Sequence, residues 1–302
     1  MTKPLISIVV IFDQVRESKL RRLLESMKEQ LSSQKMNSNK IEVLFVHESN
    51  VPRSCPEMPF SVKYFTIPEK QGIPFNRNKG IEFAKGEIIV FIDDDCWVQE
   101  KWLESLVNPL LEDQNLYAIT SGTKIPSSNF LGNCISALGF PGGGSLGFTK
   151  VWKVDAQGFT DHLAVGNCAL RRTIFEKVGL FDLDMRYGAE DAEFSHRLMN
   201  AGLRIKYVPE GYALHEARSD LRSFIRWQLR RGKANYHFKQ KVGNINPFVK
   251  LRLWSTKNIL LNNLNYRLPF VFFLLGFSFC LQQTGFFMEK RITKKINRLF
   301  LN

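Results

Sequence analysis

The sequence contains few cysteines, and none has the spacing of a metal site or of a redox pair. The five are odd in number and include no CxxC motif; they are Cys55, Cys96, Cys134, Cys168 and Cys280. This pattern excludes a CxxC zinc or redox module and argues against a disulfide scaffold. We expect reduced thiols in a cytoplasmic protein.

Glycine-rich phosphate-binding motifs are missing from the first hundred residues, where strands and helices alternate. Neither GxGxxG nor GxxxxGK[ST] occurs there, which argues against a dinucleotide fingerprint and a P-loop. A recognisable nucleic-acid-binding motif is also missing, so we expect no nucleic acid as partner.

Acidic residues are scarce in the C-terminal third. Residues 202–302 hold 4 Asp and Glu against 19 Lys and Arg, whereas residues 1–201 hold 25 against 23. The net charge of +13 therefore belongs to the end of the chain. Such asymmetry indicates a polyanionic partner, either nucleic acid or the anionic face of a membrane.

No apolar run spans a bilayer without including polar residues. Leu268–Leu281 is shorter than the roughly 20 residues needed, and extension to Phe287 would bury Gln282 and Gln283. Residues 289–302 alternate an apolar face with basic residues, typical of a helix in the membrane plane. We predict monotopic attachment to the inner, cytoplasmic face of the cell membrane. The alternatives are a spanning helix, which would export the basic tail, and a helix buried against the rest of the chain.

The chain does contain alternating strands and amphipathic helices, with 44% hydrophobic residues to form a core. This alternation predicts an α/β fold with parallel pairing, beginning with a strand rather than a signal peptide. A run with five glycines, Gly139–Gly147, is a candidate mobile loop or a plain surface loop. The expected strands are Leu5–Phe12, Ile41–Val46, Val62–Ile67, Ile88–Ile92, Leu116–Ile125, Leu203–Val208 and Gly211–His215. The expected helices include Glu17–Leu31, Trp102–Leu111, Asn129–Leu138 and Arg171–Val178.

Three carboxylates follow the most apolar strand. Ile88–Ile92 is typical of a strand buried on both faces, and Asp93, Asp94 and Asp95 come directly after it. Like charges there repel by roughly 4 kcal/mol per pair at about 4 Å and an effective dielectric of about 20. A solvated turn or a bound cation must offset this repulsion. Because ligands of open α/β sheets bind beyond the carboxyl ends of strands, we interpret the cluster as a Mg²⁺ or Mn²⁺ site carrying a phosphate-bearing ligand.

Several short motifs occur in a fixed order: Asn76–Gly80, Asp93–Asp95, Gly166–Asn167 before Arg171 and Arg172, Leu180–Asp182, Glu190–Asp191 and His215. Each motif alone is weak, but together and in this order they resemble those of the family 2 glycosyltransferases, which have the GT-A fold, over roughly residues 4 to 240. Two turns differ from the family pattern: Ile11–Gln14 replaces a PTYN-like turn, and His47–Asn50 replaces DDGS, with Glu48 keeping a carboxylate for the nucleobase.

The resemblance implies roles for these residues. Asp191 would be the general base, with Glu190 orienting Asp191 or the acceptor; on local evidence alone, the pair would cap the following helix. A divalent cation would be held by Asp95, His215 and either Asp93 or Asp94. Gly166 and Asn167 would belong to an acceptor-side loop. The donor nucleotide would be bound by Glu48, Arg77, Asp93, Asp94, Arg230 and Arg231.

Two of these roles have structural alternatives. A lone histidine after a strand, such as His215, can be structural. Arg230 and Arg231 can belong to a solvated basic face instead of contacting phosphate.

We therefore predict a GT-A catalytic domain at residues 1–218, with a Rossmann-like, mixed but mainly parallel sheet flanked by helices, and a helical, basic and apolar extension at residues 219–302. Its predicted function is metal-dependent, inverting transfer of a sugar from a nucleotide-sugar donor to a lipid-linked or cell-surface glycan. One alternative is nucleotidyl transfer on the same fold, which would release pyrophosphate. The other is a non-enzymatic nucleic-acid-binding module, which would not depend on Asp95.

Overall fold

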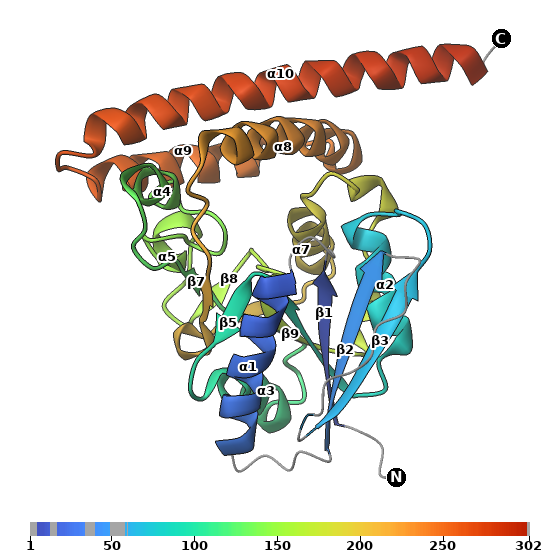
Figure 1. The fold of residues 1–302 in the computed structure, drawn as a ribbon. Coiled ribbons are helices and arrows are strands. Elements are labelled where there is room, and N and C mark those ends of the chain that lie inside the picture. Colours follow the sequence, from blue (N-terminus) through green and yellow to red (C-terminus); the bar gives the residue numbers. More distant parts are fainter. Residues whose placement is uncertain (1–4, 13–16, 34–39, 49–57, 59, 301–302) are drawn as a thin grey trace.

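The computed structural model describes residues 5–12, 17–33, 40–48, 58 and 60–300. A sheet in the order β3-β2-β1-β4-β9-β6-β10-β8 forms its centre (Figure 1). The strands β3, β2, β1 and β4 pair parallel with one another, and β9 pairs antiparallel with both β4 and β6. The predicted mixed, mainly parallel sheet with flanking helices and a helical extension is confirmed.

The bounds of the elements agree with most of the predicted segments. The large sheet contains β1 (Ile6–Phe12), β2 (Ile41–Glu48), β3 (Ser61–Ile67), β4 (Ile88–Asp93), β6 (Ala118–Thr120), β8 (Phe159–Thr160), β9 (Asn167–Arg171) and β10 (Ile205–Tyr207). A small sheet contains β5 (Cys96–Val98), β11 (Ala213–His215) and β7 (Thr123–Lys124). The helices are α1 (Glu17–Ser33), α2 (Ile73–Phe83), α3 (Trp102–Glu112), α4 (Phe130–Ser136), α5 (Phe148–Val151), α6 (Ile174–Val178), α7 (Glu190–Asn200), α8 (Leu221–Val242), α9 (Asn246–Leu261) and α10 (Leu268–Phe300), with short 3-10 turns η3 (Leu183–Met185) and η4 (Pro209–Gly211).

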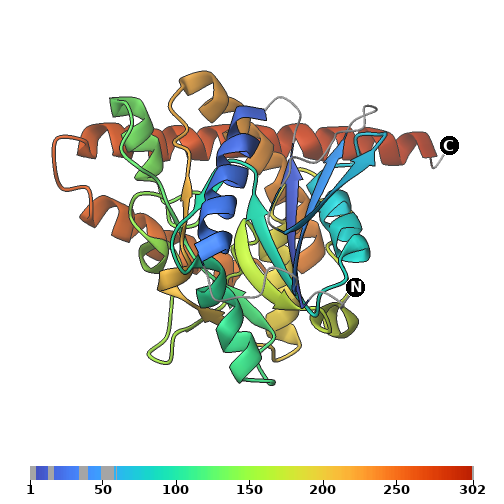
Figure 2. The same cartoon turned by 60° about the horizontal axis from the view of Figure 1, so that its bottom comes forward.

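Helices cover both faces of the large sheet (Figure 2). Successive side chains of a strand point to opposite faces, so Ile8 and Val10 of β1 pack with α1 and α3, while Val9 packs with α2 and α7. All three are fully buried. Double-sided burial explains why the central strands are continuous apolar runs rather than alternating ones.

Two predicted elements differ from the structure. Leu116–Ile125 is not one strand, because the chain leaves the large sheet after β6 and enters the small sheet at β7. Gly122 lies at this crossing, where a Cβ would stand 2.9 Å from the carbonyl oxygen of Gly142. The predicted helix Arg171–Val178 begins only at Ile174, since Arg171 ends β9.

Arg171 and Arg172, at the end of β9, lie outside any helix and bind the C-terminal ends of two other helices. The Arg171 guanidinium donates to the carbonyls of Leu110 and Asp113 at the end of α3. That of Arg172 donates to the carbonyls of Ile81 and Ala84 at the end of α2. Both therefore satisfy carbonyl groups that a helix leaves unpaired at its C-terminus.

The C-terminal extension forms a helical layer, with α8 and α9 between the large sheet and α10 (Figure 1). Its apolar core is shared with α4, because Cys134 and Ile135 pack with Phe224, Ile259 and residues of α10. The boundary predicted at residue 218 falls in the link between β11 and α8.

The apolar run and the basic tail are one continuous helix, α10, rather than two pieces. Its inner face is fitted closely to α8: a Cβ on Gly232 would lie 2.1 Å from the carbonyl oxygen of Gln282, and one on Gly285 would lie 2.1 Å from that of Leu229. The Gln282 side chain also donates to Gln228 at 2.7 Å. The helices can approach this closely only because both crossing positions lack a side chain.

We expect Gly285→Ala to destabilise the protein by about 1–3 kcal/mol, as overpacking does elsewhere. Gly276→Ala is the matched control, because it lies in the same helix and a Cβ added there would meet no atom within 4 Å; this variant should gain helix propensity. Urea unfolding of both variants measures the difference. Equal stabilities would mean that α10 is not held at this crossing.

Candidate active site

One cleft brings all of the predicted site residues together. It lies beyond the carboxyl ends of β1 and β4 and is closed by residues of α8, α9 and α10. Strands and loops separated in sequence converge there, as expected at this edge of an α/β sheet. Its lining includes Glu48, Arg77, Asp93, Asp94, Asp95, Gly166, Asn167, Glu190, Asp191, His215, Arg230 and Arg231.

A buried arginine occupies the centre of the acidic residues. Arg77 on α2 donates to Glu190 at the start of α7 and to Asp93 at 3.4 Å. Burial raises the pKa of Glu190, and the charge of neighbouring Asp191 raises it further, while Arg77 opposes both. Although burial acts to lower the pKa of Arg77, the charges of Glu190 and Asp93 raise it overall. The guanidinium therefore remains charged and holds the two carboxylates together.

Asp93 fills the place where residue 166 would carry a side chain. A Cβ on Gly166 would lie 2.3 Å from Asp93 Oδ2, and the Asp93 amide donates to the Gly166 carbonyl at 3.2 Å. Burial raises the pKa of Asp93, with Asp95 adding to the effect and Arg77 opposing it. Glycine is needed at position 166 to admit this carboxylate.

Of the predicted cation ligands, Asp95 and His215 lie together in one cluster, and a contact of Asp93 with the cation stays a prediction. The potential ligand atoms of Asp95, Cys96 and His215 lie within 4.8 Å of one another, and His215 Nε2 is 3.0 Å from Asp95 Oδ1. Antiparallel pairing of β11 with β5 sets His215 opposite Cys96. Asp93 forms an ion pair with Arg77, with 3.4 Å between the charged atoms.

The donor atoms of this cluster fit a hard divalent cation. His215 Nδ1 donates to the Glu216 carbonyl at 2.7 Å, which leaves Nε2 facing Asp95 as a ligand. Burial raises the pKa of the Cys96 thiol well above its usual range, and the Asp95 charge raises it further. A protonated thiol is a poor ligand, so the oxygen and nitrogen donors favour Mg²⁺ or Mn²⁺.

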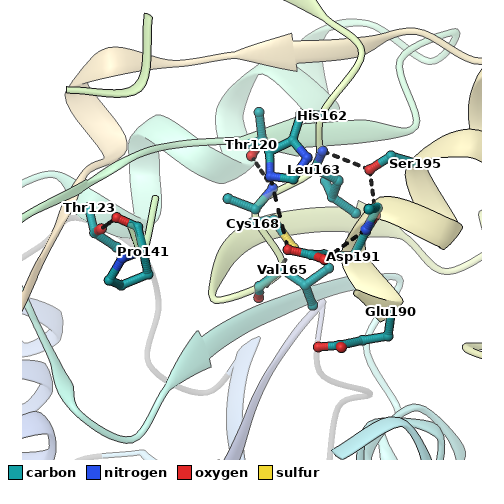
Figure 3. Close-up of polar contacts among 12 residues, drawn as sticks. Thr120, Thr123, Pro141, His162, Leu163, Val165, Cys168, Glu190, Asp191 and Ser195 are labelled. Atoms are coloured by element: carbon teal, nitrogen blue, oxygen red, sulfur yellow. Dashed lines mark hydrogen bonds and ion pairs between the residues drawn. The ribbon is translucent and has the colours of Figure 1, made fainter. Parts of the chain in front are cut away.

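Asp191 lies in the first turn of α7 beside a histidine that the sequence did not identify (Figure 3). His162 Nε2 is 4.0 Å from Asp191 Oδ2. The Leu163 amide donates to Ser195 at 2.9 Å, and the Ser195 hydroxyl donates to the Asp191 carbonyl at 2.6 Å. These bonds fix the loop of His162 to the start of α7.

Burial sets the protonation of both groups. It lowers the pKa of His162 to about 3, so this imidazole is neutral near pH 7. Burial also raises the pKa of Asp191, against the hydrogen bond from the Ala192 amide and the charges of Arg77 and Arg231. A neutral His162 leaves the Asp191 carboxylate without a further cation that would weaken it as a base.

The side chain of Asn167 has a structural role, and the acceptor-side role of its loop stays a prediction. Its fully buried amide donates to the carbonyls of Gly122 and Gly211, both at 2.9 Å, and its oxygen accepts from Trp102 at 2.8 Å. Both N–H donors of the side chain are therefore used within the protein. Asn167 joins the two sheets where the cleft begins.

Glu48 holds the start of α2. One oxygen, Oε1, accepts from the amides of Gln71 and Gly72 at 2.8 and 2.6 Å and from the Asn76 side chain at 3.0 Å. Asp94, the second carboxylate of the acidic run, is buried at 4% exposure. Nucleobase contact by Glu48 and ribose contact by Asp94 stay predictions. Four residues of the two unusual turns, Asp13, Gln14, Ser49 and Asn50, and likewise Cys55, lie outside the described residues.

The two neighbouring arginines of α8 have different surroundings. Arg230 is exposed, and its Nε donates to the Tyr187 carbonyl at 3.0 Å just before α7. Arg231 points into the cleft, where its guanidinium stacks on Phe140. Only Arg231 therefore has the setting expected of a ligand-binding cation, and which ligand it contacts stays a prediction.

Two residues that line the cleft, His162 and Arg252, were not identified from the sequence. His162 stacks on Trp152 with 4.3 Å between ring centroids, and Arg252 lies on α9. Neither belongs to a motif or to a periodic segment. Their only sequence signal is residue type, which does not distinguish them from other histidines and arginines of the chain.

Comparison with known proteins identifies the fold and the family of the sequence. Residues 7–179 match the family model described as Glycosyl transferase family 2. Human polypeptide N-acetylgalactosaminyltransferase 14 is 26% identical over 222 residues, which cover 68% of this chain and 39% of that protein. Glycosyltransferase AglE of Haloferax volcanii is 24% identical over 244 residues, covering 77% and 73%. The chain spans well under half the length of the first of these curated relatives.

A solved structure supports the same fold. The mannosyltransferase PcManGT from Pyrobaculum calidifontis, in complex with GDP-Man and Mn²⁺, aligns with a TM-score of 0.56 at 18% identity. The alignment covers 93% of this chain and 76% of that one. The predicted GT-A fold is confirmed.

Proposed function

Since the chain belongs to glycosyl transferase family 2, we propose that it transfers a sugar from a nucleotide-sugar donor to an acceptor hydroxyl, with inversion at the anomeric carbon. One observation carries the proposal: the cation cluster of Asp95 and His215 and the carboxylate of Asp191 line the same cleft. A donor diphosphate and an attacking hydroxyl can therefore be bound at once. The names of the curated relatives and of PcManGT support the transfer of a sugar.

In the proposed reaction, the acceptor oxygen attacks the anomeric carbon while the bond from that carbon to the diphosphate breaks. The diphosphate leaves with the electron pair, and Asp191 accepts the proton of the hydroxyl. Attack from the side opposite the leaving group inverts the configuration. Arg77 and Glu190 position Asp191 through the first turn of α7, and neutral His162 borders the carboxylate without pairing as a cation.

Asp95 and His215 are the residues proposed to hold the cation. Mg²⁺ or Mn²⁺ bound there would supply positive charge to the departing diphosphate. The chemistry of the two donors fits such an ion, and PcManGT was solved with Mn²⁺ and a nucleotide sugar. We propose that the second carboxylate oxygen of Glu48 faces the nucleobase, because three donors already occupy the first oxygen.

A screen of nucleotide sugars tests the function. Mn²⁺ and the correct donor together should raise the melting temperature, by the equivalent of about 2.7 kcal/mol when the ligand is at 100 times its Kd. Asp95→Ala should lose the Mn²⁺-dependent part. Glu112→Ala, an exposed acidic residue outside the cleft, is the control. The proposal would be contradicted if no donor stabilised the protein, or if Mn²⁺ and the donor stabilised Asp95→Ala as much as the unchanged protein. Release of pyrophosphate from the nucleotide sugar would indicate nucleotidyl transfer instead.

We propose that the acceptor is lipid-linked or part of a cell-surface glycan and that the enzyme works on the inner face of the cell membrane. By length and composition α10 could cross a membrane, and only 22% of its apolar window is buried. Its outer face exposes phenylalanines, among them Phe272, Phe273 and Phe279 at 64–67%. Exposed basic residues follow on the same helix, and these complement anionic lipid headgroups.

Attachment in the membrane plane is favoured over a spanning helix by the contacts of α10. The inner face is fixed to α8 by the glycine crossing and by buried Glu289, which accepts from His237 at 3.0 Å. A spanning orientation would have to separate α10 from α8 and expose this polar face to lipid.

Replacing Phe272, Phe273 and Phe279 together by serine should weaken binding to anionic vesicles by roughly a hundredfold or more, since each buried phenylalanine contributes about 1.5–3 kcal/mol. Vesicle flotation measures the effect. Leu180→Ser with Leu183→Ser, at exposed apolar positions outside the helical layer, is the control. Undiminished flotation would exclude this face, and cleavage of the C-terminus by external protease in right-side-out vesicles would indicate a spanning helix.

A further inference from the structure

Two arginines from different helices converge on one aromatic ring in the cleft. The guanidinium carbons of Arg231 on α8 and Arg252 on α9 lie 4.1 and 4.6 Å from the ring centre of Phe140. All three residues line the cleft. Within the part of the chain that the structure describes, neither guanidinium makes a hydrogen bond or an ion pair. Their ten N–H donors in two planar forks are thus available to a ligand.

Neither arginine forms an ion pair with a carboxylate among the described residues, although both are partly buried. Burial and the charge of Arg252 together lower the pKa of Arg231 to about 9, against the opposing charge of Asp191. Burial lowers the pKa of Arg252 to about 10. Two neighbouring cations in a partly desolvated place disfavour each other, and a bound anion would relieve both.

A buried hydroxyl lines the same cleft on the helix of Arg252. Ser255 is one helical turn beyond Arg252 on α9, lines the cleft and is 1% exposed. Its Oγ has no hydrogen-bond partner among the described residues. A buried hydroxyl without a partner is unfavourable, and an oxyanion at the arginine pair would provide an acceptor for it.

A chain of stacked rings connects the arginine pair to the proposed base. The Phe140 ring packs edge-on against Trp152 at 5.5 Å, and Trp152 stacks on His162 at 4.3 Å. His162 in turn borders Asp191 at 4.0 Å. Asp191 is also the acidic group whose charge raises the pKa of Arg231. The pair therefore adjoins the place where the acceptor hydroxyl would be deprotonated.

We propose that Arg231 and Arg252 bind a phosphate group of the acceptor, so that the acceptor is a phosphate ester with its reactive hydroxyl near Asp191. This inference rests on the proposed glycosyl transfer and replaces the donor-side role expected for Arg231. A single guanidinium satisfies both oxygens of a carboxylate, whereas two forks match the larger charge and the additional oxygens of a phosphate. The phosphate can belong to a lipid headgroup or to a soluble glycan ester.

The test uses sn-glycerol 3-phosphate as the probe, titrated calorimetrically into the full chain with and without Mn²⁺ and a panel of nucleoside diphosphates. We expect saturable binding that persists when nucleotide is bound. Arg231→Gln and Arg252→Gln should each weaken the affinity by about tenfold or more, as loss of a charged hydrogen-bonding partner does. Arg226→Gln on α8 and Lys257→Gln on α9 remove exposed charges and should leave it unchanged.

Two further measurements are needed. One distinguishes weakened binding from a folding defect, and the other identifies the source of the phosphate. Arg252→Lys retains the charge but not the fork and should bind with intermediate affinity, while the thermal unfolding of all variants reports folding. Flotation on phosphatidylcholine vesicles with and without phosphatidic acid, compared between Arg252→Gln and Lys257→Gln, identifies a lipid headgroup when only the former loses binding. Equal flotation of the two, with weakened binding of the soluble probe, identifies a soluble ester.

Equal probe affinity in Arg252→Gln and Lys257→Gln would overturn the inference. Displacement of the probe by Mn²⁺ with a nucleoside diphosphate would also overturn it, because the arginines would then belong to the donor site. Both results leave the proposed glycosyl transfer intact. That function fails separately, when no nucleotide sugar stabilises the protein with Mn²⁺.

Discussion

Asp191→Asn should retain donor binding but lose sugar transfer by roughly 10²-fold or more, because an amide cannot take the proton of the attacking hydroxyl. The substitution keeps the shape of the side chain and its acceptor for the Ala192 amide, which donates to Asp191 Oδ1 at 2.7 Å. Transfer is measured as release of nucleoside diphosphate. Donor binding is measured by thermal shift in the same protein.

The pH profile gives a second readout of the same role. Burial raises the pKa of Asp191 above its ordinary value of 3.8, so the base is protonated and the rate falls as pH decreases through this raised pKa. The residual activity of Asp191→Asn should lack this acid limb. Asp161→Asn, an exposed carboxylate of the same cleft, is the control and should retain both rate and profile. Undiminished transfer by Asp191→Asn would remove Asp191 from the role of base.

Arg77→Met should lower the free energy of unfolding at neutral pH by about 3–5 kcal/mol, because it leaves the buried Glu190 carboxylate without its cation. Arg77 is 6% exposed and contacts both Glu190 and Asp93. Lys79→Met on the same helix removes an equal charge from an exposed ion pair with Glu82 and should cost at most about 1 kcal/mol. Denaturant unfolding compares the two variants.

The loss caused by Arg77→Met should depend on pH in a defined direction. The pKa of Glu190 is already raised above its ordinary 4.5, mainly by burial, and removal of Arg77 raises it further. A carboxyl with a raised pKa in the folded state favours folding below its unfolded pKa, and this advantage is lost as pH rises through the folded pKa. The deficit should therefore be smallest near pH 4.5 and grow toward neutral pH. Arg77→Met combined with Glu190→Gln should recover part of the loss at neutral pH, and a deficit independent of pH would contradict the electrostatic explanation.

The sequence predicted the convergence of the site because the relevant signals are local. A continuous apolar run followed by Asp93, Asp94 and Asp95 identifies a buried strand and its acidic end. The acidic pair at Glu190 and Asp191 identifies the start of a helix. In an α/β fold the strand ends gather at one edge, so residues distant in sequence could be assigned to one cleft before their contacts were known.

The contacts within the cleft were not predictable in the same way. Arg77 and Glu190 pair across 113 positions, and nothing in either segment specifies the other. The motif of Asn167 did not predict that its amide joins two sheets. The acidic run did not predict that Asp93 forms an ion pair with Arg77. Polar side chains choose partners by distance and burial, which only the folded chain defines.

The amino-acid order by itself determined the family, the α/β architecture, the acidic strand end and the basic, apolar character of the last hundred residues, because each depends on neighbours along the chain. Tertiary packing alone decided which carboxylate stands with His215, that His162 borders Asp191, and that two arginines share the ring of Phe140. It also joined two predicted C-terminal pieces into one helix seated on α8 through glycines. These features depend on the dielectric environment of each group and on close approach between segments distant in sequence. A local sequence pattern determines neither of them.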